Sequence, residues 1–141
     1  MIMHKIKLLA VTVLGIASLA LPLAAQADIK IYNHSPVPST TRVDGGQCSF
    51  PSLGAQGITG ANSENTIYRK AIVMACIVSS TRKQSCHADV YMSGDCSGEV
   101  VSTIWLTKDQ SAIERIEPKS NAYTLASSYR EGMVTVDIYK N

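Results

Sequence analysis

The stretch Cys86-His-Ala-Asp-Val-Tyr-Met92 decides the fold class, because its side chains alternate between apolar and polar types. Successive side chains of a strand point to opposite faces of a sheet, so this pattern predicts a strand with one buried and one wet face. The residues expected on the core face are Cys86, Ala88, Val90 and Met92, and those on the outer face are His87, Asp89 and Tyr91.

Short patterns of the same kind recur along the chain between turn residues. They predict strands over residues 28–33, 40–43, 47–50, 100–107, 122–126 and 133–139. Asp44-Gly-Gly46 favours a tight hairpin turn, because such turns need positive φ angles. Residues 51–65 are rich in Gly, Ser and Asn and indicate a long surface loop. We therefore predict an all-β fold, a small antiparallel β-sandwich or barrel.

Two segments are ambiguous in the sequence. The apolar run Ala71-Ile-Val-Met-Ala-Cys-Ile-Val78 fits a strand buried on both faces or the core of a helix beginning near Asn65. Its β-branched content favours the strand. Asp109 is a candidate cap for a short helix over the following residues, and the alternative is an edge strand that ends at Pro118.

The first 27 residues predict a secretory signal peptide. Lys5 and Lys7 precede an apolar run over residues 8–21, and Ala25-Gln-Ala27 supplies small residues for a cleavage site. The run of about 14 apolar residues is shorter than the roughly 20 that span a bilayer. We expect residues 28–141 to form one periplasmic or secreted domain without stable membrane insertion.

The positive formal charge of +2 belongs to this leader. Two of the 13 basic residues, Lys5 and Lys7, lie in the leader and none of the 11 acidic residues does, so the predicted domain is balanced. Its longest basic clusters are the pairs Arg69-Lys70 and Arg82-Lys83. A nucleic-acid partner is therefore not expected.

The cysteines predict two disulfides, because an even number follows an export signal. A zinc site is disfavoured, since no C-x-x-C pair exists. We favour the pairing Cys48–Cys76 with Cys86–Cys96, in which no loop encloses another. The nested pairing, Cys76–Cys86 with Cys48–Cys96, is the alternative.

Residues that could perform chemistry are few. The sequence holds no hydrolase elbow, metalloprotease helix, Walker loop or dinucleotide fingerprint, and we expect no cofactor. His87 and Asp89 share one strand face about 7 Å apart, with Tyr91 next along it, and form our candidate binding patch. Tyrosines also suit recognition surfaces; they are Tyr32, Tyr68, Tyr91, Tyr123, Tyr129 and Tyr139.

Three segments together resemble a group of short exported proteins of Gram-negative, often host-associated, bacteria. They are Asp28-Ile-Lys-Ile-Tyr-Asn33, Asp44-Gly-Gly-Gln-Cys48, and Cys86-His-Ala-Asp-Val-Tyr91 with Cys96-Ser-Gly98. The resemblance implies a secreted or periplasmic protein with no defined enzymatic activity.

These observations favour an exported, non-enzymatic module that binds a protein, glycan or surface partner, for example a secreted host-interaction factor. One alternative is a small secreted hydrolase or metal-dependent enzyme that uses His87 and Asp89; His34 would join them only if folding brings it close. Another is an inhibitor of a secreted enzyme that presents the loop 87–95. The sequence sets no oligomeric state.

The signal peptide makes a direct prediction about the mature chain. We expect the intact mass of the exported protein to correspond to residues 28–141. A mass that includes Met1 in the exported fraction would contradict this boundary.

Overall fold

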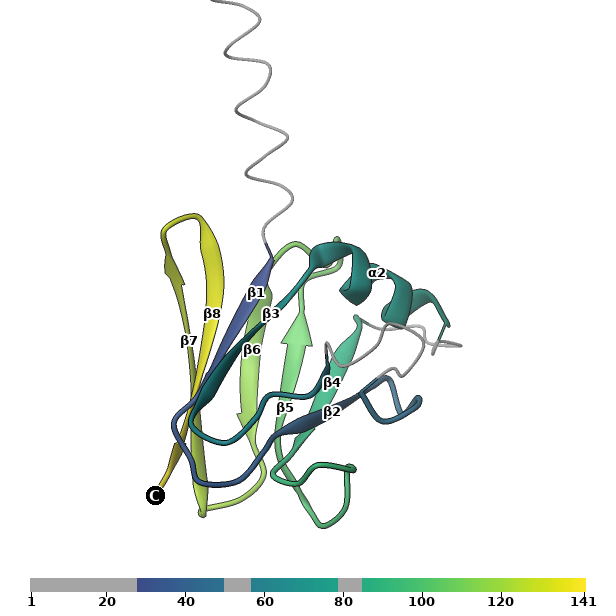
Figure 1. The fold of residues 1–141 in the computed structure, drawn as a ribbon. Helices are drawn as coiled ribbons and strands as arrows, with labels where there is room; N and C mark the ends of the chain where they lie inside the picture. Colours follow the sequence, from purple (N-terminus) through teal and green to yellow (C-terminus); the bar gives the residue numbers. More distant parts are fainter. Residues whose placement is uncertain (1–27, 50–56, 79–84) are drawn as a thin grey trace, which may run out of the picture.

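Two four-stranded sheets face each other in the computed structural model, which describes residues 28–49, 57–78 and 85–141 (Figure 1). The elements are β1 (Ile29–Asn33), β2 (Thr40–Val43), β3 (Ser63–Ile67), α2 (Arg69–Val78), β4 (His87–Tyr91), β5 (Val100–Leu106), β6 (Ile113–Pro118), β7 (Tyr123–Arg130) and β8 (Met133–Lys140). The first sheet has the order β3-β1-β8-β7 and the second β2-β4-β5-β6. The predicted sandwich is confirmed, and the predicted signal peptide lies outside the described residues.

The first sheet is built around β1. This strand pairs antiparallel with β3 and parallel with β8, so that Ile31 lies beside Val136 and Tyr32 beside Asp137. On its other side β8 pairs with β7, which precedes it in the chain, and the two strands form a hairpin. Its two turn residues, Glu131 and Gly132, have φ angles of 52° and 78°, as a tight hairpin turn of mirror-image type requires.

The core lies between the two sheets. Alternate residues of each central strand point inward, which is why the apolar positions of the sequence recur at every second residue. The buried cluster takes Ile31, Val136 and Ile138 from the first sheet and Val90, Ile104 and Leu106 from the second. An apolar cavity of about 80 Å³ remains between the sheets beneath α2.

The favoured strand over residues 71–78 is wrong, because the structure holds the helix α2 there. The carboxylate of Asp28 accepts a hydrogen bond from the backbone N–H of Arg69 at 2.8 Å, which satisfies a donor that a helix start leaves unpaired. Ala71 and Ala75 are good helix formers and are buried against the sandwich. Met74 and Ile77 remain exposed, so the run is apolar on both sides of a helix that is only half buried.

The structure also tests several of the predicted turns and strands. Residues 113–118 form the edge strand β6 rather than a helix. Asp44 and Gly45 have φ angles of 49° and 72° and make the predicted turn. The predicted return strand over 47–50 is reduced to a single bridge between Arg42 and Cys48, and Phe50 lies outside the described residues. The loop expected over 51–65 ends earlier, because β3 begins at Ser63.

The favoured disulfide pairing is also wrong. The structure joins Cys48 to Cys96 and Cys76 to Cys86, which is the nested alternative. The reason is the antiparallel pairing of β2 with β4, which brings the loop after β4 back to the start of β2. There the backbone N–H of Cys96 donates to Thr40 Oγ1 at 3.1 Å, and Cys48 forms an isolated bridge with Arg42 of β2. The favoured disulfide pairing was chosen because neither of its loops encloses the other, and that criterion takes no account of long-range strand pairing.

Among the described residues, none of the helices combines the length and apolar character that crossing a membrane requires.

The disulfide pairing can be checked by peptide mapping without reduction. Trypsin leaves Cys86 and Cys96 in one peptide, because no Lys or Arg lies between them, so a second cleavage before Asp95 is needed. We expect the peptide with Cys48 linked to that with Cys96, and the peptide with Cys76 linked to that with Cys86. A link between Cys48 and Cys76 would contradict the structure.

Candidate binding face

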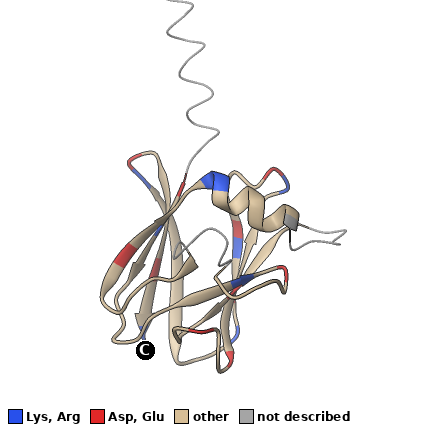
Figure 2. Cartoon of the chain, turned by 45° about the vertical axis from the view of Figure 1, so that its right-hand side comes forward, with Lys and Arg blue, Asp and Glu red and all other residues tan. Residues whose placement is uncertain are grey.

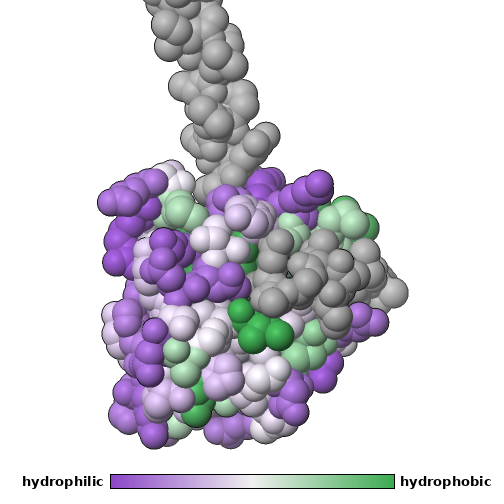
Figure 3. All heavy atoms as spheres, in the orientation of Figure 1, coloured by the Kyte–Doolittle hydropathy of each residue, from purple (hydrophilic) through white to green (hydrophobic). Residues whose placement is uncertain are grey.

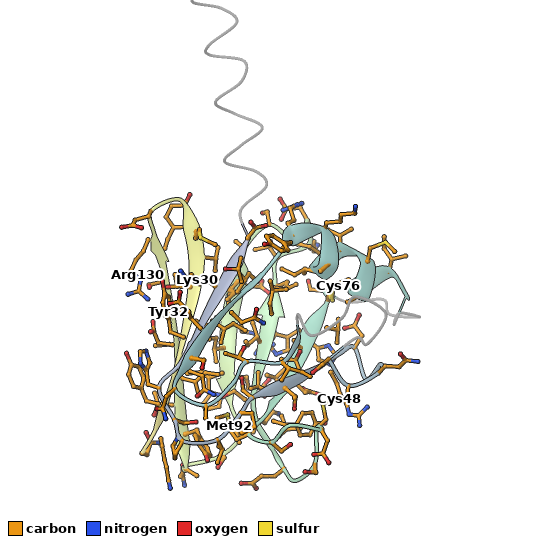
Figure 4. All side chains as sticks on the ribbon, in the orientation of Figure 1. Lys30, Tyr32, Cys48, Cys76, Met92 and Arg130 are labelled. Atoms are coloured by element: carbon orange, nitrogen blue, oxygen red, sulfur yellow. A yellow bond between two sulfur atoms is a disulfide. The ribbon has the colours of Figure 1, made fainter. Side chains whose placement is uncertain are left out.

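The outer face of the first sheet gathers aromatic and charged side chains, and we call it the tyrosine face. Its members are Lys30, Tyr32 and His34 from β1 and the residue after it, Glu64 from β3, Arg130 from β7, and Asp137 and Tyr139 from β8. Figure 4 shows Lys30, Tyr32 and Arg130 together on this side of the sheet. Figure 3 shows that the same side of the molecule is mostly hydrophilic.

Three rings of the tyrosine face form a stack. The rings of His34 and Tyr139 are 4.6 Å apart at an interplanar angle of 8°, and those of Tyr32 and His34 are 6.3 Å apart at 11°. The backbone N–H of His34 donates to the carbonyl of Ile138 at 2.9 Å, which holds the ring beside β8. Tyr139 ends the stack and is 46% exposed, so an aromatic surface remains available to a ligand.

The charges of the tyrosine face are paired. Asp137 accepts hydrogen bonds from His34 Nε2 at 2.8 Å and from Arg130 Nη2 at 2.9 Å. Lys30 lies 3.3 Å from Glu64, and the hydrogen bond between them raises the pKa of Lys30. Lys30 and Arg130 also lie over the ring of Tyr32, at 5.3 and 5.0 Å from its centre. The face therefore presents both signs of charge, already held in place.

A shallow pocket adjoins the stack. It is lined by residues of β1, the segment after it and β3: Tyr32, Asn33, His34, Asn62, Ser63 and Glu64. Asn33 is buried and its side-chain amide donates to the carbonyls of Val37 and Gly60, at 2.8 and 3.1 Å. These bonds fix the chain that carries His34, because the turn that follows β1 is tied to the segment before β3.

The patch predicted from the sequence lies on the outer face of the second sheet. His87 Nδ1 is 3.1 Å from Asp44 Oδ1, Asp89 accepts a hydrogen bond from Thr103 at 2.7 Å, and Tyr91 lies 6.0 Å from the guanidinium of Arg42. The predicted side chains thus share a face; Asp89 and Tyr91 contact neighbouring strands, and His87 contacts the turn after β2. Their role in binding stays a prediction.

Trp105 and Glu117 adjoin the predicted patch. The ring of Trp105 lies 4.7 Å from that of His87 and 4.7 Å from the guanidinium of Arg115. Its indole N–H donates to Glu117 at 3.1 Å, and Lys119 donates to the same carboxylate at 2.9 Å. The bonds from Lys119 and then Trp105 lower the pKa of Glu117 to about 2. We call this surface, with the predicted patch, the tryptophan face.

His34 and His87 do not form a shared site. His34 contacts Tyr139 and Asp137 on the outer side of the first sheet, whereas His87 contacts Asp44 and Trp105 on the second. Across the described ranges, no group of three or more His, Cys, Asp or Glu side chains is placed to hold a metal ion. His34 therefore does not join His87 and Asp89, and an enzyme that uses His87 and Asp89 stays a prediction.

Comparisons with known proteins give a family and a fold. A family model described as the type II secretion system (T2SS) substrate NttC matches residues 2–137. The crystal structure of the Legionella pneumophila T2SS substrate NttC is similar, with a TM-score of 0.60 and 21% sequence identity; the match covers 83% of this chain and 100% of that one. No curated protein matches. At this identity the crystal structure supports the fold alone.

The tryptophan face makes a prediction about pH. Because the pKa of Glu117 is lowered from 4.5 to about 2, its ionised form stabilises the fold above pH 4.5, and this contribution is lost as the pH falls towards 2. We expect nuclear magnetic resonance titration to place the pKa of Glu117 near 2. Trp105→Phe should raise it, because the indole N–H is lost. A pKa of Glu117 near 4.5 in the wild type would contradict the observed contacts.

Proposed function

The chain belongs to the family of the type II secretion system substrate NttC, and from this premise we propose that it is a secreted, non-enzymatic module that binds an uncharged glycan through the tyrosine face. A protein delivered outside the cell meets polysaccharides and glycoconjugates on the surface of the cell that secretes it and on other surfaces. The tyrosine face has the chemistry to engage such a ligand.

The observation that carries the proposal is the ring stack that ends at half-exposed Tyr139 beside the carboxylate of Asp137. The apolar C–H faces of a sugar ring pack against aromatic rings, and its hydroxyls both donate and accept hydrogen bonds. Asp137 and Glu64 offer acceptors, Arg130 and Lys30 offer donors, and the phenol groups offer both. These groups alternate across the four strands of the first sheet.

Pre-organisation supports the same conclusion. Asp137 is held by two partners, the Lys30–Glu64 pair joins β1 to β3, and the rings restrict one another. Less side-chain freedom is therefore lost when a ligand binds, which raises affinity for a given contact area.

The charge distribution favours an uncharged ligand over a polyanion. Each cation of the tyrosine face is already paired with a carboxylate. Figure 2 shows Lys and Arg interspersed with Asp and Glu over the described part of the chain rather than gathered in one field. Attraction of an acidic polymer needs an excess of positive potential, which this arrangement does not supply.

The paired state of the carboxylates supports binding rather than catalysis. Both oxygens of Asp137 accept hydrogen bonds from basic side chains, one from His34 and one from Arg130. A carboxylate held in this way is suited to position a ligand hydroxyl. Catalysis would instead need a carboxylate free to give or take a proton at the substrate.

A glycan array probed with the mature protein, residues 28–141, tests the proposal. We expect retention of neutral oligosaccharides, measured afterwards by titration calorimetry. Tyr139→Ala should weaken binding about 10- to 30-fold, the range expected for an aromatic anchor at the centre of an interface. His34→Ala should weaken it as well, because Tyr139 loses its stacking partner.

Two controls separate this face from other surfaces. Tyr68→Ala removes a tyrosine that is 54% exposed elsewhere and should leave the affinity unchanged. Asp89→Asn changes the patch predicted from the sequence and should also leave it unchanged. Loss of binding in Asp89→Asn but not in Tyr139→Ala would move the site to the tryptophan face. An array with no neutral glycan retained would overturn the proposed ligand class.

A further inference from the structure

The free edge of β7 differs from the other sheet edges in the described residues. The strands at the ends of the two sheets are β3, β7, β2 and β6. β3 and β2 are short, with 5 and 4 residues, and each carries a charge, Glu64 and Arg42. β6 carries three charges and ends at Pro118. These features discourage pairing with another chain.

β7 has none of these protections. It is 8 residues long and carries no charge and no proline from Tyr123 to Tyr129. Its pairing with β8 runs without a register shift along the whole strand. A long, regular, uncharged edge is a template for another strand.

The hydrogen-bond pattern shows which groups this edge offers. The N–H of Asn141 donates to the carbonyl of Ala122, and Arg130 and Met133 close the two-residue hairpin. Bonded pairs alternate along antiparallel strands, so the even-numbered residues of β7 bond to β8. The backbone groups that point away from β8 belong to Tyr123, Leu125, Ser127 and Tyr129.

The side chains on the inner side of this edge include an aromatic ring with little cover. Tyr123 and Leu125 pack against the core. Tyr129 shares their face of the sheet because of the two-residue period, and yet it is 64% exposed.

We propose that β7 pairs antiparallel with β7 of a second copy of this chain, around a two-fold axis at Ala126. The two first sheets then form one continuous eight-stranded sheet. In this register Tyr123 lies opposite the partner's Tyr129, and Leu125 lies opposite the partner's Ser127. On the outer side Thr124 lies opposite the partner's Ser128, and the two Ala126 residues meet at the axis.

The fit of β7 to itself selects a second copy as the occupant. This register joins outward-pointing residues only to outward-pointing residues, so every free N–H and C=O from Tyr123 to Tyr129 gains a partner. Tyr129 packs against the partner's Tyr123, an aromatic pair of the kind that stabilises neighbouring strands. Small residues meet at the axis, and no like charges face each other across it.

The pairing also has a consequence for ligand binding, and this consequence rests on the proposed function. A two-fold axis perpendicular to the sheet keeps both tyrosine faces on the same side of the dimer. Two sites on one surface bind a repetitive ligand with higher avidity than one site does. The dimer itself is independent of the ligand, so its test does not require one.

Sedimentation equilibrium of residues 28–141 tests the pairing, with dimer expected in the wild type. Ser127→Pro removes an outward N–H, at an edge position that a folded strand tolerates. The two-fold axis makes this a loss of two hydrogen bonds per dimer, and we expect the dissociation constant to rise about 30-fold. Circular dichroism should show an unchanged monomer fold.

A charge exchange tests that the partner is a second copy in this register. Ala126→Lys and Ala126→Glu each place like charges at the axis and should each weaken the dimer, whereas an equimolar mixture should restore it as a heterodimer. Ser63→Lys, on the opposite edge of the same sheet, should leave the dimer intact.

Three outcomes would overturn the proposal. They are a wild type that stays monomeric at all concentrations, a Ser127→Pro variant that dimerises as tightly as the wild type, and an Ala126 mixture that fails to associate. If β7 of the wild type binds an extended strand of another protein while the chain stays monomeric, that result also overturns the proposal.

Discussion

The parallel pairing of β1 with β8 determines both the core and the candidate binding face. β1 lies between β3 and β8, so its inward residue Ile31 packs beside Val136 while its outward residue Tyr32 lies beside Asp137. Because side chains alternate along a strand, a shift of one residue would bury Tyr32 and expose Ile31. Burial of the core therefore fixes the register that aligns the ring stack, and folding and the proposed recognition depend on the same contact.

The disulfides reinforce the second sheet and tie the helix α2 to it. Cys76–Cys86 ties α2 to the start of β4 across a sequence separation of 10, and Cys48–Cys96 joins the segment after β2 to the loop after β4 across 48. Cross-links of this kind restrict the unfolded chain and stabilise a small domain by about 2–4 kcal/mol each. For a family secreted from the cell, such bonds suit the oxidising setting in which the protein works.

Local patterns predicted the strands, whereas features that depend on long-range contacts were missed. Residues 28–33, 86–92 and 133–139 alternate between apolar and polar types, and each forms a strand. The exposed side of α2 is apolar, like the side that covers the core. The run 71–78 therefore shows no helical period in the sequence. The tyrosine face joins β1 to β8 across about a hundred residues, and only the parallel register places His34 beside Tyr139. The six tyrosines were the sequence signal for this face, but no rule indicated which of them lie together.

We propose that the outer side of the first sheet, the tyrosine face, is a pre-organised surface for a neutral sugar. A crystal structure of residues 28–141 with a neutral oligosaccharide retained on the array tests it most directly. We expect a sugar ring packed against Tyr139, with its hydroxyls bonded to Asp137 or Glu64. A sugar bound against Trp105 and His87, with Tyr139 left uncovered, would contradict it.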